Sequence, residues 1–124
     1  MSRKSFMFIA GLMAMVFGGG MLAAPDQMLA NMAQDSEGAR HVLQWMGCML
    51  LGLGFINIGA RHDPGSIALR AVMLGNIVLH VLGFGIDVYH NSLGFVQTSG
   101  VIAGAVVHGG LVAGFVYFYS KLER

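Results

Sequence analysis

Four long apolar segments, separated by short polar stretches, dominate the hydrophobic pattern of this chain. They cover residues 6–24, 41–60, 67–89 and 98–119. A helix rises about 1.5 Å per residue, so each segment is long enough to cross the roughly 30 Å hydrocarbon core of a bilayer. The pattern predicts an all-α fold, a four-helix transmembrane bundle in which residues 1–124 form a single membrane domain.

The composition agrees with this pattern and narrows the class of function. Charged residues make up 10% of the chain, against about 25% in ordinary globular proteins. We therefore expect an integral membrane protein surrounded by the lipid bilayer. A formal net charge of +1 gives no basic patch, so nucleic acid is not an expected partner. The single cysteine, Cys48, cannot form an intrachain disulfide.

The first apolar span also resembles the apolar region of a signal peptide. Leu22-Ala23-Ala24 loosely matches a cleavage site. Pro25 would directly follow the cut, which disfavours cleavage. We therefore expect the first span to be retained as a membrane helix.

A polar segment, residues 25–40, connects the first two spans. Asp26 is followed by Met28, Leu29 and Met32, a pattern typical of a short helix that begins with an acidic residue at its positive end. We expect this segment to lie at the membrane interface on the periplasmic side.

The distribution of positive charges predicts the orientation of the chain. Four spans place both termini on one side of the membrane. The basic residues on that side are Arg3, Lys4, Arg61, Arg70, Lys121 and Arg124, and Arg40 is on the other side. By the positive-inside rule both termini are cytoplasmic, and in a bacterium the chain would lie in the inner membrane.

Three polar side chains interrupt the third span. Asn76, His80 and Asp87 are spaced i, i+4 and i+11, so on a helix they form one stripe. An unpaired polar group in hydrocarbon costs several kcal/mol, so this stripe must face protein or water. We expect the third span to be the helix around which the others pack.

His80 and His108 are predicted to lie at the same depth. Each is nine or ten residues from the outer end of its span, about 14 Å below the membrane surface. Two facing imidazoles could ligate the iron of haem b or another metal, with Gly100 and Gly104 leaving space beside them. The alternative, which we favour over haem or quinone, is a neutral histidine that hydrogen-bonds its neighbour or Asn76 and joins two helices.

Asp87 and His80 together indicate a second alternative, a proton path. Asp87 lies about one helical turn inside the outer end of its span, on the same stripe as His80. Toward the cytoplasm the deep polar residues are Asn57 and Asn76, and neither side chain titrates. A small transporter or proton carrier built on Asp87 and His80 is therefore the weaker alternative.

Glycine is frequent, with 19 residues, and it recurs at spacings of four or seven within the spans. The glycines expected to form packing faces are Gly11, Gly18, Gly47, Gly54, Gly100, Gly104, Gly110 and Gly114. Small residues let membrane helices approach closely, and these faces are more than one small bundle needs for itself. We therefore predict a non-catalytic inner-membrane subunit or interaction protein that packs onto a larger membrane complex or onto itself.

Known catalytic motifs are missing from the sequence, and a weak family pattern is present. No Gly-rich phosphate loop, HExxH pattern or serine elbow occurs, so we favour a role without catalysis and name no catalytic residue. The pattern consists of Ala24-Pro25, Gly47 with Gly52-Leu53-Gly54, Arg70 with Asn76 and His80, and His108 with Gly114-Phe115. With it the chain resembles small four-helix bacterial membrane proteins grouped as DoxX-like. That resemblance covers nearly the whole chain and implies a four-helix membrane bundle.

Overall fold

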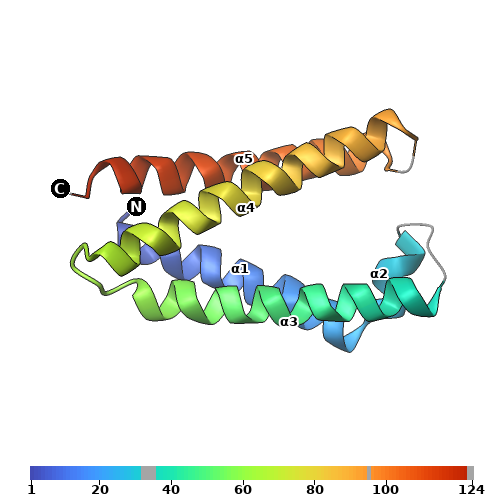
Figure 1. Cartoon of the computed structure of the whole chain (residues 1–124), viewed down its shortest axis with the longest axis horizontal. Helices are drawn as coiled ribbons and strands as arrows, with labels where there is room; N and C mark the ends of the chain where they lie inside the picture. Colours follow the sequence, from blue (N-terminus) through green and yellow to red (C-terminus); the bar gives the residue numbers. More distant parts are fainter. Residues whose placement is uncertain (32–35, 95, 123–124) are drawn as a thin grey trace. The chain divides into compact units, whose positions relative to one another are not determined.

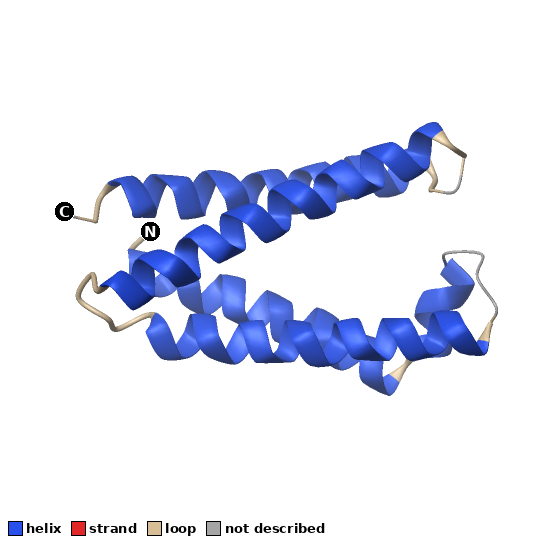
Figure 2. Cartoon of the chain, in the orientation of Figure 1, coloured by secondary structure: helices blue, strands red, loops and turns tan. Residues whose placement is uncertain are grey.

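The computed structural model describes residues 1–31, 36–94 and 96–122, and within these residues it is helical without strands (Figure 2). The helices of this part are α1 (Arg3–Ala23), α2 (Pro25–Asn31), α3 (Glu37–Ala60), α4 (Ile67–Ser92) and α5 (Thr98–Ser120). Four of them, α1, α3, α4 and α5, are long and apolar enough to cross a membrane. The prediction of four such helices is confirmed, with ends within a few residues of those expected.

The short helix α2 lies in the segment where one was expected. It begins at Pro25, and Asp26 occupies its first turn. Met32, which we expected to belong to it, and Arg124 lie outside the described residues.

Serine residues begin three of the four long helices. In each case the serine side chain accepts a hydrogen bond from a backbone amide three residues later, which satisfies one of the free donors of the first turn. The pairs are Ser2 with Ser5, Ser36 with Ala39, and Ser66 with Leu69. Helix α5 begins after Gln97 without a side-chain cap.

The helices form two compact units, Met1–His62 and Asp63–Arg124, which are described separately. In the first unit α1 packs against α3, and α2 contacts both. In the second unit α4 packs against α5. Figure 1 shows each pair as an antiparallel hairpin. Packing of all four long helices into one bundle remains a prediction.

Two pairs of glycines bring α1 and α3 into backbone contact. A Cβ atom on Gly11 would lie 2.8 Å from the carbonyl oxygen of Gly54, and one on Gly18 would lie 2.7 Å from that of Gly47. Any larger side chain would force the helices apart. Four of the predicted packing glycines are therefore used within the chain, so the argument that they form spare faces for a partner is wrong for these four.

An ion pair and a small apolar cluster fasten α2 to α3. The Arg40 guanidinium lies 2.8 Å from the Asp26 carboxylate. Below it, Met21, Leu29 and Leu43 form a buried cluster. The cluster removes the apolar side of α2 from its surroundings, which explains why so short a helix forms at this position.

The interface of α4 with α5 follows a repeat of threes and fours. On α4 the buried residues are Leu69, Met73, Asn76 and His80, and on α5 they are Leu111 and Phe115. Such spacing keeps one face of each helix against its partner along its whole length. This interface contains both an apolar half, nearer the start of α4, and a polar half.

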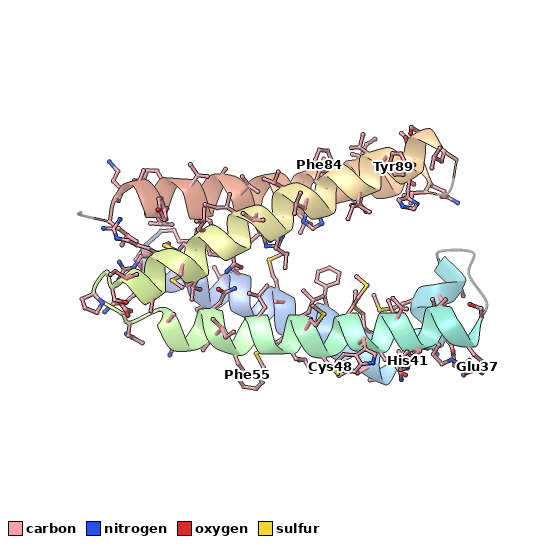
Figure 3. The ribbon with its side chains drawn as sticks, in the orientation of Figure 1. Glu37, His41, Cys48, Phe55, Phe84 and Tyr89 are labelled. Carbon is pink, nitrogen blue, oxygen red and sulfur yellow. The ribbon has the colours of Figure 1, made fainter. Side chains whose placement is uncertain are left out.

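Large apolar side chains also project outward from the long helices (Figure 3). Phe55 on α3 is 65% exposed and Tyr89 on α4 is 60% exposed. So much exposed apolar surface is unusual for a protein in water and fits helices that contact lipid.

Asp63 organises the turn that leads into α4. Its Oδ1 accepts hydrogen bonds from the amides of Gly65, at 2.8 Å, and Ser66, at 2.7 Å. Its Oδ2 accepts one from the Ser66 hydroxyl at 2.7 Å. Gly65 has a φ of +135°, a conformation that favours glycine. The turn therefore positions Ser66 to cap α4.

Replacing Asp63 with alanine is expected to lower the free energy of unfolding by about 1–2 kcal/mol, because the turn and the cap lose their acceptors. Asp63→Asn keeps one side-chain oxygen for the two amides and should lose less. Reversible unfolding in detergent micelles measures both values. Equal losses for the two variants would show that the amide hydrogen bonds do not carry the effect.

Candidate functional site

The polar half of the α4–α5 interface is centred on two histidines. His80 projects from α4 and His108 from α5, and their Nδ1 atoms are 3.0 Å apart. The ring centroids are 5.1 Å apart, with an angle of 52° between the planes. The structure thus brings together the two imidazoles that sequence spacing places at one depth. A distance of 3.0 Å is that of a direct hydrogen bond.

Phe115 packs on the other side of His80. The two rings are nearly parallel, at 20°, and their centroids are 6.4 Å apart. Phe115 is fully buried and His80 is 9% exposed. His80 is therefore held between an aromatic ring and the second imidazole, which restricts its rotation. The sequence did not indicate the contact with Phe115, because residues seven apart on α5 share a face with many partners.

Gly83 provides the space for the His108 ring. A Cβ atom on Gly83 would lie 3.4 Å from Cε1 of His108 and 3.9 Å from both ring nitrogens. That distance is close to van der Waals contact, so any longer side chain at this position would displace the imidazole. The glycine one turn after His80 therefore lets α5 present His108 to α4.

Asp87 continues the same row of polar side chains. A Cβ atom on Gly104 would lie 2.9 Å from Oδ2 of Asp87 and 3.8 Å from Cδ2 of His108. The carboxylate and the imidazole therefore share the space above Gly104. Sequence reasoning paired Asp87 with His80, but the structure places His108 beside both of them. The order along the interface is Asp87, His108, His80.

Asn76 uses its amide nitrogen within its own helix. Its Nδ2 donates a hydrogen bond to the carbonyl oxygen of Val72 at 2.8 Å, and the side chain is 1% exposed. The polar stripe of the third span is thus divided. Asp87 and His80 lie beside His108, whereas Asn76 lies deeper and bonds backward along α4. Its role in holding a cofactor remains a prediction.

The histidine pair does not have the arrangement of two axial haem ligands. Metal–nitrogen bonds are about 2 Å long, so two imidazoles on opposite sides of an iron hold their nitrogens about 4 Å apart, with a porphyrin between them. The 3.0 Å separation leaves no such space. Among the described residues no group of three or more His, Cys, Asp or Glu side chains is placed to hold a metal ion. The geometry fits the direct hydrogen bond that we favoured.

A shallow apolar groove of about 680 Å³ runs along a different face of α4. Its lining residues are Ala71, Leu74, Gly75, Val78, Leu79, Leu82, Gly83 and Ile86. A Cβ atom on Gly75 would meet nothing within 4 Å, so this glycine opens the helix surface instead of packing inside the chain. The sequence analysis missed Gly75 as a packing residue. Its spacing of four from Ala71 is the signal that could have identified it.

The remaining predicted packing glycines, all on α5, differ in their surroundings. Gly104 packs on Asp87, and Gly100 makes ordinary contact with Val96. Gly110 meets nothing within 4 Å, and Gly114 is half-buried. Helix α5 therefore has one glycine that belongs to the polar site and at least one that is open.

Comparison with protein-family models, with curated proteins and with solved structures finds no match to this chain. The resemblance to DoxX-like proteins therefore remains a prediction.

Proposed function

We propose that this chain is a non-catalytic membrane protein that binds a partner through α4. The partner is a larger membrane complex or another copy of the chain. The supporting observation is the groove along α4, where Gly75 lacks any neighbour that would fill the space of a side chain. In lipid, small residues on a helix surface permit close approach of another helix, and the resulting contacts stabilise association.

The distribution of basic residues supports an orientation for this protein. Arg3 and Lys4 precede α1 or lie in its first turn, Arg61 follows α3, and Lys121 follows α5. These positions fall on the side of both termini in a chain with four spans, so the termini are cytoplasmic. Arg40, paired with Asp26 near α2, lies on the opposite side. In a bacterium the protein resides in the inner membrane with α2 at the periplasmic surface.

Substituting leucine for Gly75 is expected to reduce recovery of the partner about tenfold, which corresponds to about 1.4 kcal/mol. The larger side chain fills the groove and keeps a second helix away. The measurement is the native mass and composition of the tagged full chain after extraction in a mild detergent.

Gly109→Leu is the matched control, because Gly109 lies on α5 and its Cβ position is also open. It should leave recovery unchanged. An equal loss in both variants would exclude the α4 groove as the binding surface. An unmodified chain that is monomeric and partnerless in native membranes would overturn the proposal itself.

A small proton carrier that uses Asp87 and His80 is the second candidate. The row formed by Asp87, His108 and His80 favours it, because ionisable groups inside a membrane helix pair are rarely there by chance. Proton flux into liposomes that contain the purified chain tests this role. Flux that survives Asp87→Asn would remove Asp87 from the mechanism. The haem alternative is not retained, because the two imidazoles are in direct contact, and no described feature favours quinone.

A further inference from the structure

Only one hydrogen atom fits between the two imidazoles of the α4–α5 interface. Their Nδ1 atoms are 3.0 Å apart, so one ring must donate its N–H and the other must offer a lone pair. The two rings therefore have different protonation states. The surroundings of each ring decide which one donates.

The surroundings of His108 fit a ring that carries both of its protons. Asp87 Oδ2 and His108 Cδ2 lie within 4 Å of the same point above Gly104, and Cδ2 is bonded to Nε2. A carboxylate therefore lies on the Nε2 side of His108, whereas His80 lies on its Nδ1 side. A doubly protonated His108 has an acceptor in each direction. The negative charge of Asp87 would balance the positive charge of the ring.

The surroundings of His80 fit a ring that stays neutral. His80 is 9% exposed and stacks on the fully buried Phe115. His108 is only half-buried. A charge is more costly the more deeply it is buried, so His80 suits the neutral acceptor and His108 the charged donor.

We infer that His80, His108 and Asp87 form a site that binds one proton. The proton comes from water and adds to the free ring nitrogen of His108. His108 then donates from Nδ1 to His80 and presents Nε2–H toward Asp87. His80 remains the neutral tautomer with its proton on Nε2. This site deepens the proton-carrier role, and its biological use rests on that role.

A second proton would destroy the arrangement. It could add only to Nδ1 of His80, the atom that accepts the hydrogen bond. Two N–H groups would then face each other across 3.0 Å, and two charged rings would lie 5.1 Å apart. The site therefore binds one proton for as long as the hairpin is intact.

No other described group of this hairpin that titrates is placed to share the proton. On α4 the interface continues inward with Asn76 and Met73, and on α5 with Leu111 and Phe115. None of these side chains titrates. On the outer side His90 lies near the end of α4 in edge contact with Tyr89. The charged and titratable groups that face the pair from α4 and α5 are thus limited to Asp87.

Nitrogen-15 NMR of the histidine-labelled full chain in phospholipid nanodiscs tests this inference, with the proton itself as the ligand. His41, His62 and His90 are replaced one at a time by glutamine to assign the other signals. We expect a coupling across the hydrogen bond between the two Nδ1 atoms. On acidification His108 should become doubly protonated while His80 stays neutral, so the pair takes up one proton and retains the coupling.

Three results would overturn the inference. The first is a pair without the coupling. The second is uptake of two protons with the coupling still present. The third is a charged His80 beside a neutral His108. The unmodified chain supplies all three readouts, so none depends on a variant that fails to fold.

Asp87→Asn tests the assignment of the counter-charge. The proton-bound form of His108 should fall about tenfold at the pH where it is half-populated in the unmodified chain, because an opposite charge within a few ångströms favours the charged ring. The coupling in the neutral state should remain, which reports an intact hairpin. Asp26→Asn is the control, since Asp26 pairs with Arg40 in the other unit. An unchanged His108 in Asp87→Asn would exclude Asp87 from the site.

Proton flux in liposomes separates this site from the carrier role. A one-proton pair without flux would leave the site standing and remove the carrier. Flux without the one-proton pair would leave a carrier and overturn the site.

Discussion

Replacing Gly18 with alanine is expected to lower the free energy of unfolding by about 1–3 kcal/mol, even though alanine is the better helix former. The new Cβ atom would lie 2.7 Å from the carbonyl oxygen of Gly47 and 2.9 Å from the amide nitrogen of Leu51. Both are backbone atoms, so neither can rotate away as a flexible side chain would. Helices α1 and α3 must separate, and they lose contacts along their length.

The adjacent glycine supplies a matched control for this prediction. Gly19 lies on the same helix, and a Cβ atom there would meet nothing within 4 Å. Gly19→Ala should therefore leave stability unchanged or raise it by up to about 1 kcal/mol through helix propensity. Unfolding of both variants in mixed detergent micelles measures the difference. Equal stability of the two variants would contradict the close α1–α3 contact.

The histidine pair should show strong energetic coupling. Replacing His108 with leucine is expected to destabilise the chain by about 1–3 kcal/mol, because His80 then keeps a buried ring nitrogen without its hydrogen-bond partner. His80→Leu should cost a similar amount. The double variant, which buries neither ring, should cost less than the sum of the single variants, with a coupling energy of about 0.5–3 kcal/mol.

Unfolding measurements on the four chains of this cycle give the coupling energy directly. His62→Leu is the control, because His62 lies exposed in the polar turn after α3 and should change stability by less than about 0.5 kcal/mol. Additive effects of His80→Leu and His108→Leu would show that the two rings do not depend on each other. That result would also remove the basis of the shared proton.

The sequence predicted the close approach of helices but not the partners in it. Gly11 and Gly18, like Gly47 and Gly54, were recognisable by their spacing of seven, which places each pair on one helix face. Spacing along one helix carries no information about which other helix meets that face. The structure shows that these two pairs meet each other, so their use by an outside partner was the wrong conclusion.

The polar site was also predictable only in part. Counting residues from the ends of two spans placed His80 and His108 at one depth, because helical rise per residue is constant. The rotation of α4 about its axis relative to α5 is not contained in such a count. That rotation decides that His108 lies beside Asp87, and that Gly83 and Gly104 make room for the ring and the carboxylate.

The sequence by itself determined the helical class of this protein, its four long apolar helices and the polar segments between them. These follow from the length and hydrophobicity of continuous stretches of chain, which are local properties. The tertiary structure alone decided that Gly18 faces Gly47, that the groove on α4 is left open within its hairpin, and that His108 lies beside both Asp87 and His80. The physical reason is that contacts between helices depend on register and rotation, which the packing of many side chains sets together.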